Sequence, residues 1–152
     1  RNTDGVGLTS TEFRPAGSGY PLGSATHRWG QIYSTNSVIS TSDENLKNSI
    51  VTIPTDKATN FIMALNPVTY KLNDGTSGRT HWGMNAQETE TALTNLNMTT
   101  LDFAGVCYDK LEDGTYRYGL RYEEFIAPII AVEQNHEKRI EALEQAITEK
   151  AA

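Results

Sequence analysis

A serine and a lysine stand five positions apart in the stretch SDENLK, which runs from Ser42 to Lys47. A serine hydroxyl is a good nucleophile only when a base removes its proton, and a neutral lysine amine is one such base. Because an unperturbed lysine has a pKa of about 10.4, desolvation or a nearby cation must favour the neutral amine. The pair therefore predicts a nucleophile and its base. The ordinary alternative is a helix-capping serine followed by a solvated lysine.

The spacing of this pair limits where a helix can lie. Five residues of α-helix rotate the chain by about 500°, which leaves the two side chains about 140° apart. Ser42 must therefore be extended or lie at the start of a turn, with the chain turning after it. Thr41 and Glu44 have the spacing of a capping box and predict such a turn. The carboxylates of Asp43 and Glu44 oppose a neutral Lys47 if they lie near it.

Other candidate sites have less support. The single cysteine, Cys107, excludes an intrachain disulfide and a cysteine-based zinc site, and its run FAGVCY predicts a buried thiol. His27 and His136 lie far apart in the sequence, and the acidic loops lack the ligand spacing of a calcium site. We expect no metal and no cofactor. His81 and Trp82 stand in a predicted strand and are expected to be a buried histidine and a core aromatic residue.

The charge of the chain limits the classes of partner that it can bind. Its 152 residues carry a net charge of -6 without a run of Lys and Arg, which argues against binding to nucleic acid or to a membrane surface. The longest apolar run, FIAPIIAV, is too short to span a membrane. The first residues, RNTDGVGLTS, lack Met and resemble no signal sequence, so we expect a fragment of a longer polypeptide.

The first 41 residues differ from the rest. They are rich in Gly, Ser and Thr, with short β-prone pieces between Gly and Pro turns. Their aromatic residues, which recur without a helical period, are Phe13, Tyr20, Trp29 and Tyr33. Such a segment buries little surface on its own. We expect it to be the end of an extended β-structure, residues 1–42, that packs against other chains.

The remaining residues alternate helical and strand patterns. Helical spacing predicts helices over residues 55–65 and 87–96, the first capped by Thr55. Alternating apolar residues and turn signals predict two antiparallel pairs, residues 68–72 with 80–86 and residues 103–109 with 115–122. These elements predict an α+β domain over residues 43–152.

The longest predicted helix runs from about Tyr122 to Glu149. Its apolar residues follow one another at intervals of three and four along much of its length, as the seam of a coiled coil requires. These residues are Phe125, Ile129, Val132, Ile140, Leu143 and Ile147. His136 extends the seam from Val132, and the repeated step of four to Ile140 is a stutter. The stripe predicts helix–helix association but leaves the number of helices open.

Three blocks of the sequence are similar, in content and order, to one known family. LGSATHRWGQIYSTNSVISTSDENLKNSI resembles the junction in phage tail-fibre and tailspike proteins between the fibre stem and a C-terminal intramolecular chaperone domain. ALNPVTYKLNDGTSGRTHWGMNAQETETAL resembles the central block, including a Gly-x-x-Ala-Gln-Glu element that ends at Gln87 and Glu88. YGLRYEEFIAPIIAVEQNHEKRIEALE resembles the terminal block. The chain thus resembles the auto-processing chaperone domains (peptidase S74 family) of phage tail fibres, tailspikes and endosialidases.

The resemblance implies a trimeric domain that folds the preceding fibre chains into a β-rich stem and then releases itself. Carried over by position, Ser42 and Lys47 are the dyad of a self-cleaving serine peptidase, and the cut falls between Ser42 and Asp43. Local chemistry favours another bond, because attack by Ser42 on the carbonyl of Thr41 forms a five-membered ring. Attack on its own carbonyl needs a strained four-membered ring. Both positions of the cut stay open.

The implied partners are two further copies of the chain and the upstream stem, with no nucleic acid and no membrane. The mature fibre belongs to the virion under this hypothesis, and the chaperone domain is made in the host cytoplasm and released after cleavage. The alternative is a non-cleaving trimer cap or a receptor-binding fibre tip. The presence of both Ser42 and Lys47 favours the self-cleaving class.

Overall fold

The computed structural model describes residues 6–8, 13–15, 20–36, 38–75 and 77–151. The chain divides into two compact units, Arg1–Thr41 and Ser42–Ala152. In the first, β1 (Val6–Leu8) pairs with β2 (Phe13–Pro15) in antiparallel fashion. Residues 20–36 form bends and irregular segments with mostly exposed side chains. The expectations that rest on residues 1–5, 9–12 and 16–19 lie outside the described residues.

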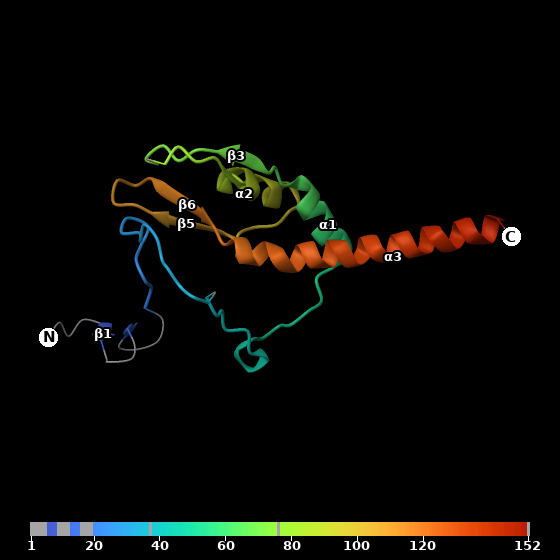
Figure 1. Ribbon diagram of the computed structural model, residues 1–152, viewed down its shortest axis with the longest axis horizontal. Coiled ribbons are helices and arrows are strands. Elements are labelled where there is room, and N and C mark those ends of the chain that lie inside the picture. Colours follow the sequence, from blue (N-terminus) through green and yellow to red (C-terminus); the bar gives the residue numbers. More distant parts are fainter. Residues whose placement is uncertain (1–5, 9–12, 16–19, 37, 76, 152) are drawn as a thin grey trace. The chain divides into compact units, whose positions relative to one another are not determined.

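The second unit has the predicted α+β class (Figure 1). Its helices and helical turns are η1 (Glu44–Leu46), α1 (Thr55–Ala64), α2 (Ala86–Asn95), η2 (Tyr122–Phe125) and α3 (Ile126–Ala151). Its strands are β3 (Val68–Tyr70), β4 (His81–Gly83), β5 (Val106–Lys110) and β6 (Tyr116–Leu120). β3 pairs with β4 and β5 with β6, both antiparallel. The two hairpins therefore form separate ribbons in the described part of the chain.

The start of α1 differs from the prediction in one detail. Pro54 occupies the N-cap position, without a side-chain hydrogen bond, and Thr55 is the first helical residue. The fixed backbone of proline suits a helix entrance. The helix ends at Ala64, shortly before Asn66 and Pro67, as the sequence indicates.

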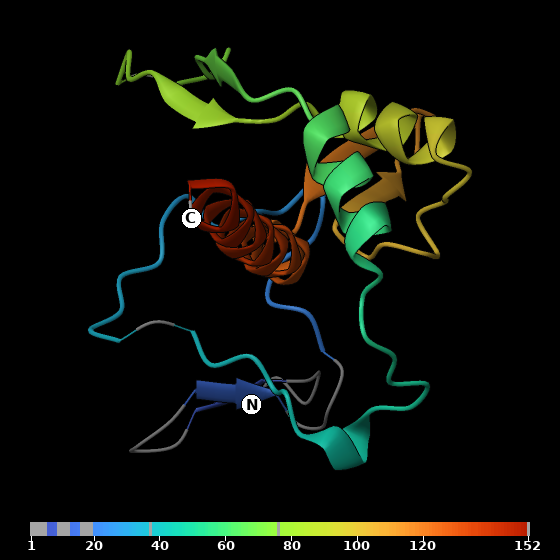
Figure 2. The ribbon, with the colours of Figure 1, turned by 90° about the vertical axis from the view of Figure 1, so that its right-hand side faces the viewer.

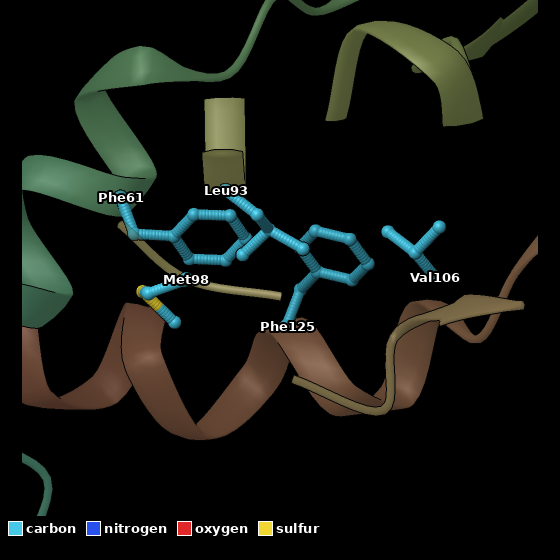
Figure 3. Packing of buried hydrophobic residues seen from close by; sticks show 5 residues of the cluster. All are labelled: Phe61, Leu93, Met98, Val106 and Phe125. Carbon is cyan, nitrogen blue, oxygen red and sulfur yellow. The ribbon is translucent and has the colours of Figure 1, made fainter. Parts of the chain in front are cut away.

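The core joins α1, α2, β5 and η2. Figure 3 shows its cluster of buried side chains, which consists of Phe61, Leu93, Met98, Val106 and Phe125. The rings of Phe61 and Phe125 stack with centroids 6.1 Å apart, and Phe103 meets both rings edge-on. Aromatic pairs of this kind add to the free energy gained by burying their area. Phe125 thus anchors the start of the long helix in the core.

The long helix α3 begins later than predicted. A 3-10 turn occupies Tyr122–Phe125, and α3 starts at Ile126, with Pro128 in its first turn, where the missing N–H costs no helical hydrogen bond. α1 packs against α3, and Figure 2 shows this pair with α3 seen nearly along its axis. Pro128 and Val132 are the buried residues of α3. None of the described helices combines the length and apolar character that a membrane span requires.

Three burial predictions, those for Trp82, Cys107 and His81, are wrong. Trp82 is 86% exposed, because no other described element covers its side of the β3–β4 ribbon. Cys107 is half-buried rather than fully buried, since β5 and β6 form a ribbon of two strands. His81 is half-buried, and its ring stacks on Tyr70 with centroids 5.4 Å apart.

Candidate active site

Ser42 and Lys47 lie at the two ends of one helical turn. Lys47 Nζ donates a hydrogen bond to Ser42 Oγ over 2.8 Å. The turn between them is η1, in which the Leu46 N–H donates to the carbonyl of Asp43 and the Lys47 N–H to that of Glu44. A 3-10 helix closes in three residues, so the lysine side chain reaches back across the turn. The structure therefore brings together the two residues that the sequence singles out.

The backbone on either side of the turn is extended. Asp43 is the N-cap residue of η1, with φ −65° and ψ 130°, and Lys47 is the C-cap residue, with φ −119° and ψ 155°. Ser42 thus precedes the turn, as its distance from Lys47 in the sequence requires. With the amine neutral and the proton on the serine oxygen, the same contact suits removal of the serine proton.

The side chain of Asp43, and not a capping box of Thr41 and Glu44, caps the turn. Its Oδ1 accepts hydrogen bonds from the backbone N–H and the Nδ2 of Asn45, each over 2.9 Å. The capping-box prediction fails because the turn starts at Glu44, one residue after Asp43. The hydrogen bond from the Asn45 backbone, followed by that from its side chain, lowers the pKa of Asp43.

Asn45 is a residue of the site that sequence reasoning missed. An aspartate that precedes a turn commonly accepts the N–H two residues on, and this spacing was the available signal. The capping contact also holds the Asp43 carboxylate on Asn45. In the described part of the chain, no ion pair joins Lys47 to Asp43 or Glu44. The acids beside the dyad therefore do not hold the lysine as an ion-pair partner.

The whole site is open to solvent. Every residue from Ser42 to Ile50 is exposed, including both members of the dyad and the apolar Leu46 and Ile50. A serine that acts as a nucleophile needs a neutral base, and solvent favours the ammonium form of lysine. The single chain therefore supplies the geometry of the dyad without the desolvation that its chemistry needs.

Glu88 serves the start of α2 rather than the dyad. Its carboxylate accepts from Asn85 Nδ2 over 2.9 Å and from Asn66 Nδ2 over 3.0 Å, which joins the end of the α1 region to the α2 entrance. These hydrogen bonds, first that from Asn85, lower the pKa of Glu88. Glu88, which ends the Gly-x-x-Ala-Gln-Glu element, thus holds the entrance of α2.

The described residues form no cluster of metal-binding side chains. Within residues 6–8, 13–15, 20–36, 38–75 and 77–151, no group of three or more His, Cys, Asp and Glu side chains is placed to hold an ion. His27 instead hydrogen-bonds through Nδ1 with the neighbouring hydroxyl of Thr26, 3.0 Å away.

Residues 42–98 match the model of the family Peptidase_S74, chaperone of endosialidase. The carboxy-terminal domain of the bacteriophage T5 L-shaped tail fibre, with its intramolecular chaperone domain, has a similar fold (TM-score 0.64, 22% identity). That similarity covers 90% of this chain and 39% of the tail-fibre chain. The crystal structure of a novel intramolecular chaperone gives a TM-score of 0.55 at 23% identity, over 64% of this chain and 99% of that one. No curated protein matches the chain.

The resemblance inferred from the sequence is therefore confirmed. The chain carries the sequence pattern of this chaperone family over residues 42–98 and the fold of a phage tail-fibre chaperone domain. The family match begins at Ser42, which is also the first residue of the second compact unit.

Proposed function

We propose that residues 43–152 are an intramolecular chaperone that trimerises, folds the phage tail fibre or tailspike attached to it, and releases itself by autoproteolysis at Ser42. Residues 1–42 are then the end of the β-rich stem. The fibre takes its place in the virion, and the freed domain stays in the host cytoplasm. The family match and the tail-fibre fold support the chaperone role. The observation that carries the cleavage is the 2.8 Å contact between Lys47 Nζ and Ser42 Oγ.

Two routes of cleavage use this contact differently. In the first, neutral Lys47 accepts the Ser42 proton, and Oγ attacks the carbonyl of Thr41 through a five-membered ring. The Thr41–Ser42 amide becomes an ester, the freed Ser42 amine takes up the proton, and water then hydrolyses the ester. The products end at Thr41 and begin at Ser42. The dyad acts within one chain in this route.

The second route cuts the Ser42–Asp43 bond, the position that the family resemblance implies. A water activated by the dyad, or a serine from a neighbouring chain, attacks the carbonyl of Ser42, and the amine of Asp43 leaves with a proton. An acyl ester formed by a neighbouring serine is then hydrolysed by water. The products end at Ser42 and begin at Asp43. The form of this route that uses a neighbouring serine requires an assembled trimer.

Assembly supports the chemistry in either route. Both side chains of the dyad are exposed in the single chain. A neighbouring chain that covers Lys47 removes water from the amine and favours its neutral form. Cleavage then follows trimerisation, so that the domain leaves only after its folding task. The exposed apolar residues of η1 and the loop after it, Leu46, Ile50 and Val51, are suited to such a contact.

The alternative is a non-cleaving cap or a receptor-binding tip at the end of a fibre. The observation that favours it is the exposure of both Ser42 and Lys47, which leaves the lysine solvated. In that case the serine and lysine have a local structural role, and the fold holds three fibre ends together without chemistry.

Intact mass under denaturing conditions separates the two functions. The freshly expressed chain is compared with Ser42→Ala, Lys47→Ala and the control Ser49→Ala, which removes an exposed serine from the loop after η1. We expect two fragments from the wild type and the control, and one intact chain from each dyad variant. The fragment masses distinguish a cut after Thr41 from a cut after Ser42.

A wild-type chain that stays uncut while sedimentation shows a trimer supports the cap instead. Cleavage of Ser42→Ala at the wild-type rate removes the serine from either mechanism.

A further inference from the structure

Exposed loops of the chain contain residue pairs whose sequence favours a reaction of the side chain with its own backbone. Among them are Asn48–Ser49, Asp74–Gly75 and Asp113–Gly114. In this reaction the backbone nitrogen of the second residue attacks the side-chain carbonyl carbon of the first and closes a five-membered succinimide ring. Asparagine is chemically labile partly for this reason. The attack needs solvent access, a small second residue and a backbone N–H that is not engaged in a hydrogen bond.

Both Asp-Gly pairs are protected by hydrogen bonds of the glycine backbone. The Gly75 N–H donates to the carbonyl of Leu72 over 3.1 Å, and the Gly114 N–H donates to the carbonyl of Leu111 over 3.0 Å. Each nitrogen must lose its hydrogen bond before it can attack, and this opening costs free energy. The sequence therefore favours two places that the fold protects.

Asn48 and Ser49 lack this protection. Both residues are exposed and lie in the loop between η1 and α1. Among the residues that the structure describes, none accepts a hydrogen bond from the Ser49 N–H. Ser49 Oγ donates instead to Asn48 Oδ1 over 3.2 Å. This hydrogen bond draws electron density from the side-chain carbonyl carbon and stabilises the negative charge that ring closure places on Oδ1.

The backbone of the loop favours the same reaction. Ser49 has a φ of 52°, in the left-handed region that residues with a side chain seldom adopt. A strained bend persists only where its surroundings hold it, and the exposed loop supplies few contacts that could do so. The loop can therefore reach the geometry of ring closure at little cost in free energy.

Asn97 provides the internal comparison. It is also exposed and lies at a bend, with its own φ at 55°. The next residue, Met98, is buried, and its N–H donates to the carbonyl of Leu93 over 2.9 Å. Asn97 thus has the solvent access of Asn48 without a free nitrogen beside it.

We propose that Asn48 is a self-modification site whose product, a carboxylate beside Lys47, slows the dyad. The Ser49 nitrogen bonds to Cγ of Asn48, and the side-chain amide leaves as ammonia with the proton of that nitrogen. Water then opens the ring. Opening at the Cγ carbonyl gives aspartate, and opening at the backbone carbonyl gives isoaspartate. Both products replace a neutral amide with a negative charge.

The new charge acts on the base of the dyad. Lys47 must be neutral to accept the Ser42 proton, and a nearby carboxylate favours its ammonium form. This consequence rests on the proposed self-cleavage, whereas the modification itself does not. A chain that assembles and cleaves promptly escapes the modification, and one that ages before assembly loses its rate of cleavage. Asn48 then sets a time limit on release of the domain.

Peptide mapping by mass spectrometry measures the modification in aged Ser42→Ala chains. We expect Asn48 to react at least about tenfold faster than Asn97, because the Met98 N–H must first be freed by local opening. In chains unfolded by urea the ratio of the two rates should fall, since both nitrogens are then free. Equal rates in the folded chain, or a ratio that urea leaves unchanged, overturn the inference.

Freshly made chains test the effect on cleavage. Asn48→Asp supplies the carboxylate at once, and Asn48→Gln is the neutral control, because its longer side chain does not form the five-membered ring. We expect the Asp variant to form fragments about two- to tenfold more slowly than the Gln variant at low salt, with a smaller difference at high salt that screens the charge. Equal rates at low salt overturn the effect on the dyad.

The two measurements also separate this inference from the function on which it rests. If the wild type and Asn48→Gln both stay uncut, the proposed self-cleavage fails and the effect on the dyad fails with it. The rates at Asn48 and Asn97 still decide whether the modification occurs, because they are measured in chains that lack the Ser42 hydroxyl.

Discussion

Lys47 Nζ lies 2.8 Å from Ser42 Oγ because a single 3-10 turn, and not a longer helix, separates the two residues. An α-helix through the same five positions directs the side chains about 140° apart. The turn is itself capped by Asp43, whose carboxylate accepts two hydrogen bonds from Asn45. The candidate active site is therefore a local structure formed by six consecutive residues.

The cap of this turn should control the cleavage rate. Asp43→Ala removes the acceptor for Asn45 and should slow cleavage about three- to tenfold, because fewer chains hold Lys47 beside Ser42. Asp43→Asn keeps a side-chain oxygen and should retain most of the rate. Glu44→Gln, at the next position, is the control. The measurement is the first-order rate of fragment formation. Equal rates for the Ala and Asn variants would show that Asp43 does not act through the turn.

Cleavage should require assembly. The double variant Ile140→Glu, Leu143→Glu places two charges in the exposed stripe of α3 and should prevent association, because repeated like charges cannot be buried together. We expect such chains to remain monomeric and uncut, with Lys47 solvated. Sedimentation velocity gives the oligomeric state, and intact mass gives the extent of cleavage. Glu141→Gln, outside the stripe, is the control. A monomer that cleaves at the wild-type rate contradicts the coupling.

The stability of the domain should fall in acid, in part because of Glu88. The hydrogen bonds from Asn85 and Asn66 lower the pKa of Glu88 below its ordinary value of 4.5. A carboxylate with a lowered pKa stabilises the folded state above its ordinary pKa, and this contribution is lost as the pH falls through the lower, folded-state value. The thermal midpoint of Ser42→Ala chains should therefore drop below about pH 4.5.

Glu88→Gln should reduce the acid-dependent part of this drop, and Glu141→Gln should leave it unchanged. Asp102 and Asp113 also have lowered pKa values, through hydrogen bonds from Thr99 and Thr115, so part of the acid dependence should remain. Melting curves between pH 3 and pH 7 measure the effect. If the thermal midpoint falls by the same amount in acid in Ser42→Ala chains with and without Glu88→Gln, Glu88 does not contribute to the acid dependence of stability.

The core should be sensitive at Leu93. This side chain is completely buried, so Leu93→Ala should cost about 2–5 kcal/mol of the free energy of unfolding through lost contacts and a cavity. Leu101, which is 97% exposed, provides the matched control, and Leu101→Ala should change stability by less than about 0.5 kcal/mol. Urea unfolding at one fixed protein concentration, in the Ser42→Ala background, compares them. Similar losses for both leucines would show that the cluster around Leu93 is not the core.

Local patterns in the sequence predicted the elements well where one face of each is buried. Helical spacing placed α1 and α2 within one residue of their bounds. The residues with that spacing include Ile62, Leu65, Leu93 and Leu96, which all belong to the core cluster or pack against it. Trp82 shows the limit of such reasoning. Its strand was predicted, but an aromatic residue in a two-stranded ribbon needs a covering layer to be buried, and no pattern within the strand reports that layer.

The candidate site was predictable in its residues and only in part in its geometry. The distance of Lys47 from Ser42 in the sequence required a turn, and the turn is present. The capping residue was misassigned, because the sequence offers two candidates: Thr41, three positions before Glu44, and Asp43, two positions before Asn45. Only the backbone conformation shows that Asp43 is the N-cap residue. The seam of α3 was misassigned for a related reason. Apolar spacing alone does not tell a residue that packs inside its own chain, such as Val132, from one that is free.

The exposed second half of α3 has a thermodynamic consequence. Residues 137–151 bury no side chain within their own chain, and helical segments of this length are only marginally stable in water. In the proposed trimer, contacts with the other copies stabilise their helical state. The helix content should then depend on protein concentration, so that dilution frays these last turns before it disturbs the core around Leu93.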